Sequence, residues 1–153
     1  MARPGETITN PVTGLTITWV TVSPELLEWD DYYPRQGLRV APHVHPEMTE
    51  HWHVVEGIVR FRVGEEEHEI GPGEGVAASP GTTHAAWNVT HGARMRVSMR
   101  PALRWAEVVE QLVAWAEEGK TDENGTPQGE LILQMLRDYA PEIAPPDMTA
   151  SNS

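Results

Sequence analysis

Residues 41–57, APHVHPEMTEHWHVVEG, gather side chains of the kind that bind transition metals. This segment holds four of the seven histidines of the chain and three of its glutamates. If residues 43–45 form a strand, His43 and His45 project from the same face. Glu50 begins a second alternating run and would bring its carboxylate to the same place. Buried imidazoles and a carboxylate are costly unless they are paired or bound to a cation. The segment therefore predicts a metal site.

A fourth donor follows in the stretch SPGTTHAAWN, where Pro80-Gly81 forms a turn and His84 opens the next strand. The chain has no cysteine, so nitrogen and oxygen atoms must hold any metal. Three neutral imidazoles and one carboxylate suit divalent iron, manganese, nickel, cobalt, copper or zinc and leave coordination positions open. We predict that one such ion per chain is bound by His43, His45, Glu50 and His84.

Other residues near this site have candidate roles in binding or catalysis. Trp52, Met48 and Met95 are candidate substrate-binding residues, although aromatic and thioether side chains on strands are more often plain core. Glu50 is the candidate catalytic residue, since it could accept a substrate proton if it dissociates from the metal.

The remaining histidines are expected outside the site. Strand alternation directs His51 and His53 away from the metal, towards the exterior or an interface. His68 and His91 lie in a hairpin and a loop and are expected in solvent. None of the four enters the predicted ligand set.

Two kinds of periodicity surround these residues. Short runs with period two, broken by Gly, Pro and acidic turns, indicate strands in residues 15–22, 58–70 and 93–100, with a hairpin turn at Gly64-Glu65. After Pro101 apolar residues recur at steps of three and four from Leu103 to Ala116, which predicts an amphipathic helix. A second helix is predicted in QGELILQMLRDYA, with Pro127 in its first turn.

Length and composition indicate one domain. A chain of 153 residues with 39% hydrophobic residues can bury one sizeable core. We expect residues 1–101 to form a barrel, residues 102–141 a helical extension of the same domain, and residues 142–153 a disordered tail. The net charge of -12 argues against nucleic acid and membrane partners. No signal peptide or membrane helix is evident, so a cytoplasmic location is expected.

The two donor segments resemble the two motifs of the cupin superfamily. The first, G-x5-H-x-H-x4-E-x6-G, is matched by Gly37, His43, His45, Glu50 and Gly57. The second, G-x5-P-x-G-x2-H-x3-N, is matched by Gly73, Gly81, His84 and Asn88, with Ser79 in place of the proline. The resemblance implies an all-β double-stranded β-helix, the cupin jelly-roll barrel. A barrel followed by a C-terminal two-helix extension is similar to small bacterial single-domain cupins.

Two classes of function are consistent with such a site. The first is a metal-dependent enzyme acting on a small organic molecule, for which the resemblance supplies quercetin-type dioxygenases and polyketide cyclases as precedents. The second is a noncatalytic small-molecule binding or storage protein with a structural or ligand-anchoring metal, because no acid or base outside the ligand set is evident. Outward-facing Val55 and Trp87 favour self-association, and we predict a homodimer.

Overall fold

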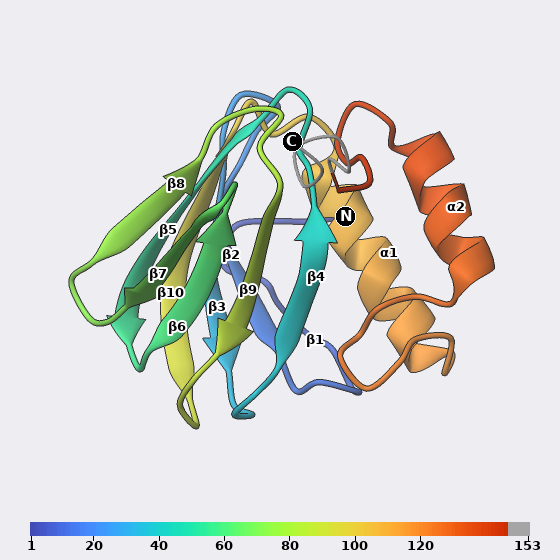
Figure 1. Cartoon of the computed structure of the whole chain (residues 1–153). Helices are drawn as coiled ribbons and strands as arrows, with labels where there is room; N and C mark the ends of the chain where they lie inside the picture. Colours follow the sequence, from blue (N-terminus) through green and yellow to red (C-terminus); the bar gives the residue numbers. More distant parts are fainter. Residues whose placement is uncertain (147–153) are drawn as a thin grey trace.

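The computed structural model describes residues 1–146, which form two facing antiparallel sheets followed by two helices (Figure 1). The larger sheet has the order β1-β2-β3-β10-β5-β8, with bounds β1 (Thr7–Thr9), β2 (Thr16–Val22), β3 (Leu27–Tyr33), β10 (Ala93–Arg100), β5 (Thr49–Glu56) and β8 (Gly75–Ala78). The smaller sheet has the order β4-β9-β6-β7, with bounds β4 (Arg39–His43), β9 (His84–Asn88), β6 (Val59–Val63) and β7 (Glu66–Ile70). The predicted all-β barrel with two C-terminal helices is confirmed.

The centre of the larger sheet follows the alternation expected from the sequence. β10 pairs with β3 on one side and with β5 on the other. Met95, Val97 and Met99 point into the core and are almost completely buried. On β5 the buried residues alternate in the same way, and Met99 lies opposite Glu50 in the register. The core therefore lies between the two sheets, and the inner face of β5 carries the carboxylate into it.

The predicted hairpin over residues 58–70 is present as β6 and β7. The turn falls between Val63 and Glu66, as expected from Gly64-Glu65. Phe61 points inward and is fully buried, and its ring packs on Trp52 with centroids 4.9 Å apart. β6 also pairs with β9, so the hairpin fixes the strand that starts at His84.

The sequence pattern did not identify β3. Its buried residues alternate as Leu27, Trp29, Asp31 and Tyr33. The run was missed because Asp31 places a carboxyl group where an apolar side chain is expected on an inward face. The strand is nevertheless held between β2 and β10 by antiparallel pairing, with one register shift on β2 between Trp19 and Thr21.

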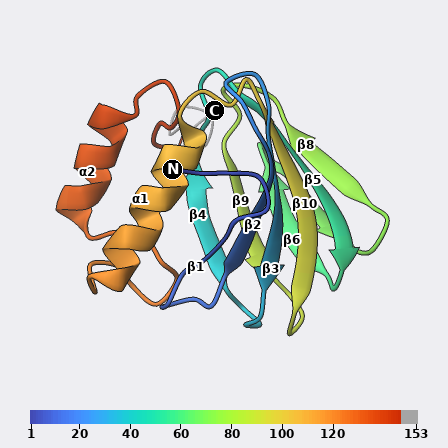
Figure 2. The same ribbon diagram turned by 180° about the vertical axis from the view of Figure 1, so that it is seen from behind.

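Helices α1 (Trp105–Glu117) and α2 (Gly129–Asp138) lie on one side of the sandwich, near β1 and β4 and away from β8 (Figures 1 and 2). Two details of the predicted helices are wrong. Leu103 precedes α1 with a positive φ of 48°, because its N–H and that of Ala102 donate to the carbonyl oxygen of Pro24. Pro127 precedes α2 rather than lying in its first turn, because it pairs with Thr121 in an isolated bridge.

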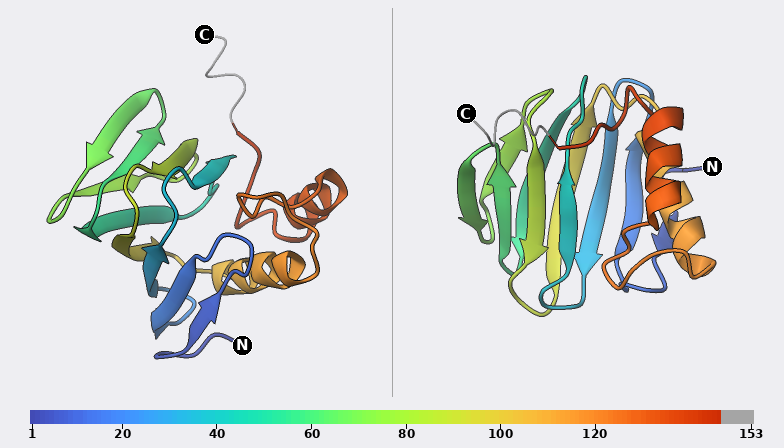
Figure 3. Two further views of the ribbon diagram at one scale, coloured as in Figure 1. Left: turned by 90° about the horizontal axis from the view of Figure 1, so that it is seen from below. Right: turned by 45° about the vertical axis from the view of Figure 1, so that its right-hand side comes forward.

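Residues 142–146, which we call the C-terminal strap, pack on the sandwich. The prediction that residues 142–153 are disordered is therefore wrong for residues 142–146. Val44 and Ala144 exchange two backbone hydrogen bonds, of 3.0 and 2.8 Å, and Ile143 is buried. Figure 3 shows the chain returning from α2 towards β4. The rest of the predicted tail, residues 147–153, lies outside the described residues.

The outer surface agrees with the alternation of β5. His51, His53 and Val55 are exposed, with Val55 at 57%. The ring of Trp87, on the neighbouring sheet, contacts two arginine side chains on the outside. Self-association through these faces stays a prediction. Among residues 1–146 no helix is both long enough and apolar enough to cross a membrane.

Candidate metal centre

Four side chains from three strand ends meet inside the sandwich. His43 is the last residue of β4, His84 is the first residue of β9, and these two residues are register partners. His45 follows β4 by two residues, and Glu50 comes from β5 of the opposite sheet. One nitrogen or oxygen atom from each of the four lies within 4.8 Å of the others. The predicted donors are therefore close enough together to hold one metal ion.

The turn before β9 is tied directly to this cluster. Gly81 adopts a φ of 79°, and its N–H donates to the carbonyl oxygen of His45 at 2.9 Å. The N–H of Thr82 donates to the carbonyl oxygen of Ser79 at 3.2 Å, which closes the turn. The turn before His84 therefore forms although Ser79 replaces the proline of the second motif.

All three imidazoles are oriented by backbone carbonyl groups. The Nδ1 atoms of His43, His45 and His84 lie 2.8, 2.8 and 3.1 Å from the carbonyl oxygens of Ala41, Glu142 and Thr82, respectively. A carbonyl oxygen only accepts hydrogen bonds, so each Nδ1 carries a hydrogen and donates it. In the neutral rings the lone pair is then on Nε2. Outer hydrogen bonds of this kind orient histidine ligands in metal sites.

The inner atoms of the cluster fit a bound cation. Glu50 Oε1 lies 3.0 Å from Nε2 of His45 and 3.3 Å from Nε2 of His84. Nε2 of His84 is buried without a hydrogen-bond partner among the described residues. Facing lone pairs repel unless a proton or a metal ion lies between them. A donor set of three imidazole nitrogens and one carboxylate suits a divalent transition metal.

The charge states of Glu50 and His43 favour metal ligation, whereas a proton on His45 competes with it. Burial would raise the pKa of Glu50, but its hydrogen bond with His45 and the close approach of His84 outweigh burial and lower that pKa to about 2. Burial lowers the pKa of His43 to about 3, and the neighbouring histidines add to the effect. Burial also opposes protonation of His45, but its hydrogen bond to Glu50 raises the pKa of this ring. The site therefore presents an ionised carboxylate, a neutral His43 and one imidazole that holds a proton more tightly than usual.

Aromatic rings enclose the cluster. Trp105, the first residue of α1, packs edge-on against His45 with ring centroids 4.6 Å apart. The ring of Trp52 packs on that of His84, with centroids 5.2 Å apart. Both tryptophans are buried. The apolar rings exclude water on two sides of the histidines, which strengthens electrostatic interactions at the site.

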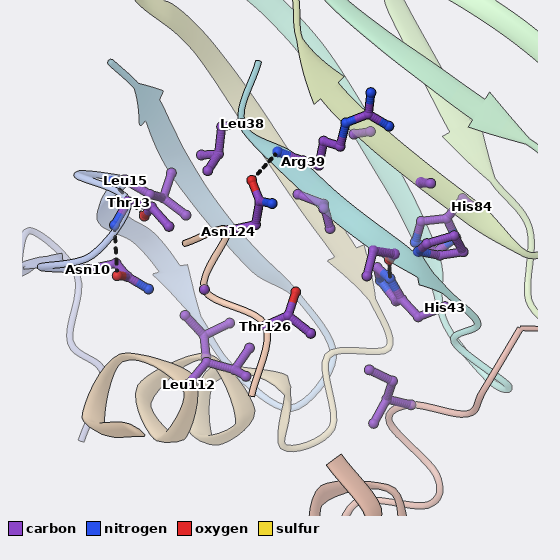
Figure 4. A pocket seen from close by; sticks show the side chains of 18 of the residues that line it. Asn10, Thr13, Leu15, Leu38, Arg39, His43, His84, Leu112, Asn124 and Thr126 are labelled. Atoms are coloured by element: carbon purple, nitrogen blue, oxygen red, sulfur yellow. Dashed lines mark hydrogen bonds between the residues drawn. The ribbon is translucent and has the colours of Figure 1, made fainter. Parts of the chain in front are cut away.

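A cavity of about 410 Å³ opens next to the cluster. It lies between the two sheets and the C-terminal helices, and His43, Glu50 and His84 line part of its wall. In Figure 4 the two histidines lie at one side of the cavity and Asn10 and Thr13 at the other, with Asn124 between them. Most of the remaining wall is apolar, with side chains such as Leu38 and Leu112. A cavity of this size and lining suits a small, largely apolar molecule.

The candidate substrate-binding residues divide into two groups. Trp52 and Met95 line the cavity. Met48 precedes β5, is fully buried and is not among the cavity-lining residues. Met48 is therefore placed as core rather than as pocket.

One acidic residue of the cavity was missed by the sequence analysis. Asp31 on β3 is buried and lines the same cavity as Glu50. Burial raises the pKa of its carboxyl group to about 8, and the negative charge of Glu50 adds to the shift. The alternation of Leu27, Trp29 and Tyr33 around it was the signal that could have identified an inward-facing acid. A titratable group outside the ligand set is therefore present.

Comparisons with known proteins agree with this architecture. Residues 32–99 match the family model described as Cupin domain (Cupin_2). This range includes all four residues of the cluster. A search of curated proteins finds no significant match.

Several solved structures are similar to the chain. The protein TT1209 from Thermus thermophilus is 28% identical with a TM-score of 0.55, over 61% of this chain and 89% of that protein. An RmlC-like cupin from Shewanella frigidimarina is 21% identical with a TM-score of 0.58, over 64% and 85%. KdgF from Halomonas sp. is 22% identical with a TM-score of 0.54, over 57% and 79%. The last two likenesses concern the fold alone.

Proposed function

We propose that the protein, whose residues 32–99 match the Cupin domain family model, is a metal-dependent enzyme acting on a small organic molecule. The observation that carries this proposal is the position of the His43, His45, Glu50 and His84 cluster at the wall of a largely apolar cavity of about 410 Å³. The four donors would hold one divalent transition metal. A purely structural metal site has no need of an adjoining cavity, whereas a catalytic site keeps an open position for substrate.

The cluster assigns a role to each of its residues. A divalent metal bound there would act as a Lewis acid towards an enol, phenol or keto oxygen and could also present dioxygen. The three histidines are held by their Nδ1 hydrogen bonds, so their Nε2 atoms point inward. Glu50 is ionised at neutral pH and is the candidate acceptor of a substrate proton.

The cavity determines which molecules can approach the cluster. Its lining is largely apolar, and its polar side chains are few. The substrate is therefore an apolar molecule with an oxygen function directed at the metal site. Two reaction types fit this arrangement, an oxygenase-type reaction and a redox-neutral cyclisation or isomerisation.

Elemental analysis and a substrate panel test this proposal. Protein purified without added metal is expected to contain about one transition-metal ion per chain. A metal-free protein with an intact fold, which also takes up no added iron, manganese, nickel, cobalt, copper or zinc, would overturn the proposal.

Incubation of metal-loaded protein with enols, phenols and ketones, monitored by mass spectrometry and oxygen uptake, then separates the reaction types. Product with oxygen uptake identifies an oxygenase, and product without it identifies a cyclase or isomerase. Ligand binding with no product would identify a noncatalytic binding or storage protein.

A further inference from the structure

Asp31 is a buried acid with no basic partner among the described residues. It is 6% exposed and lies on the inner face of β3. Its cross-strand neighbours are Ile17 on β2 and Met95 on β10, which are both buried and apolar. The adjacent Asp30 faces outward and forms an ion pair with Arg96. Arg39 also lines the cavity, but it is exposed and its guanidinium lies 5.9 Å from the ring centroid of Trp87, so no cation among the described residues pairs with Asp31.

The two oxygens of Asp31 accept hydrogen bonds of unequal length. The indole N–H of Trp29 donates to Oδ1 at 3.0 Å, so Oδ1 is an acceptor. The hydroxyl group of Tyr33 donates to Oδ2 at 3.4 Å, near the limit for a hydrogen bond, so Oδ2 is the more weakly engaged of the two oxygens. In the neutral acid the proton is then carried by Oδ2, which Tyr33 engages only weakly. The O–H group of the protonated Asp31 can then donate a hydrogen bond from Oδ2 to a molecule in the cavity.

We propose that Asp31 binds the substrate as a neutral carboxylic acid, donating a hydrogen bond from Oδ2 to a carbonyl, ether or hydroxyl oxygen. The substrate class follows from the two ends of the site. It is an uncharged, largely apolar molecule with at least two oxygen functions, one at the His/Glu cluster and one at Asp31. This inference rests on the proposed function for the cluster end, and it adds a substrate-binding residue outside the ligand set.

The charges around Asp31 support its neutral form. Burial is the main cause of the raised pKa of its carboxyl group, and the Glu50 carboxylate on β5 adds to it. On its own strand, the hydrogen bonds from Trp29 and Tyr33 act in the opposite direction, and Asp30 adds slightly to the increase. Burial also raises the pKa of Tyr33, so its hydroxyl group stays neutral. Without a metal, a second anion at Asp31 would be unfavourable in the same cavity as Glu50; a bound cation would offset the Glu50 charge and leave burial as the cause that keeps Asp31 neutral.

Paired hydroxamate probes test the inference in metal-loaded protein. Benzohydroxamic acids chelate the metal through their hydroxamate group. Each pair of probes carries, at the same ring position (ortho, meta or para), either an acetyl group or an isopropyl group of similar size. Only the acetyl group accepts a hydrogen bond. For at least one position we expect wild-type protein to bind the acetyl compound about threefold to tenfold more tightly in calorimetry. Asp31→Leu should remove the preference, while Asp31→Asn, which keeps a donor, and the control Asp30→Asn should retain it. Equal affinities at all three positions, or a preference that survives Asp31→Leu, would overturn the inference.

Infrared spectroscopy supplies a measurement that depends on neither metal nor ligand. The difference spectrum between wild-type protein and Asp31→Asn at neutral pH should contain the C=O band of a protonated carboxylic acid. Carboxylate bands in its place would overturn the neutral form of Asp31. Failure of the protein to bind metal or any hydroxamate would instead refute the proposed function, and the infrared band would still decide the state of Asp31.

Discussion

His45 donates its Nδ1 hydrogen to the backbone carbonyl oxygen of Glu142, 97 positions further along the chain, at 2.8 Å. The side chain of Glu142 is itself buried and accepts a hydrogen bond from Nη2 of Arg104 at 2.8 Å. The C-terminal strap therefore orients one of the four candidate ligands, and Arg104 holds the strap. Partners of this kind influence metal affinity although they do not touch the metal.

The variant Arg104→Met should bind metal more weakly. It removes the cationic partner of Glu142, which leaves that carboxylate buried and unpaired. We expect the strap to shift and the metal affinity to fall by about tenfold. Competition with a fluorescent chelator measures the affinity. Arg94→Met is the matched control, because Arg94 pairs with Glu56 on the exposed surface. Equal affinity in the two variants would show that the Arg104–Glu142 pair does not influence the orientation of His45.

The variant His84→Ala should lose the metal and keep the fold. It removes one nitrogen donor from β9 and leaves the backbone pairing of β9 with β4 and β6 in place. We expect metal content to fall from about one ion per chain to near zero. Elemental analysis measures the content, and circular dichroism checks the fold. His51→Ala, on the exposed face of β5, should retain the metal. Unchanged occupancy in His84→Ala would place the metal elsewhere.

Metal affinity should fall as the pH is lowered. A metal displaces the proton that His45 carries, and the hydrogen bond to Glu50 raises the pKa of His45 above 6.5. Below that raised pKa the apparent affinity should decrease about tenfold per pH unit for each proton displaced, and above it the affinity should level off. His43 and Glu50 add no competition near neutral pH, because their pKa values are about 3 and about 2. Calorimetric titrations between pH 5 and pH 8 measure the slope. An affinity that is constant over this range would contradict the assignment.

The candidate ligands could be predicted because their residue types and spacing occur within two short segments. His43, His45 and Glu50 lie within eight positions, and a two-residue period fixes which side chains share a face. The buried faces of β5 and β10 and the β6–β7 hairpin follow from the same period. In each case the prediction depended only on residues close together in the sequence, and the structure agrees with it.

Asp31 and the strap could not be predicted for a different reason. In the segment EWDDYY the alternation of Trp29 and Tyr33 assigns Asp31 to the inward face only if the segment is a strand, and the pairing with β2 and β10 is what makes it one. The Glu142 group that binds His45 is a backbone carbonyl, which every residue carries. Neither feature has a residue-type signal, because each depends on contacts between segments far apart in the sequence.

The neutral form of Asp31 has a consequence for stability. The folded protein keeps the proton up to about pH 8, whereas the unfolded chain releases it near 3.8. Raising the pH between these values therefore favours the unfolded state, by at most about 1.4 kcal/mol per pH unit. Asp31→Asn lacks this dependence, so its stability relative to wild-type protein should increase from about pH 4 to about pH 8. Urea unfolding of the metal-free proteins measures the difference, with Asp30→Asn as the control. A difference that does not change with pH would mean that Asp31 is ionised in the folded protein.

Filling the cavity should separate ligand binding from metal binding. Leu112 on α1 lines the cavity, and a larger ring at this position occupies space that a ligand needs (Figure 4). Leu112→Trp should therefore weaken the binding of benzohydroxamic acid to metal-loaded protein by at least about tenfold, because overpacking and ligand binding compete for the same volume. Metal content should stay unchanged, since no donor atom is altered. Leu133→Trp, on the exposed side of α2 where Leu133 is 65% exposed, introduces the same ring outside the cavity and should bind the probe normally. If Leu112→Trp binds the probe as tightly as Leu133→Trp does, the ligand reaches the metal from another direction, and the cavity is not the substrate site.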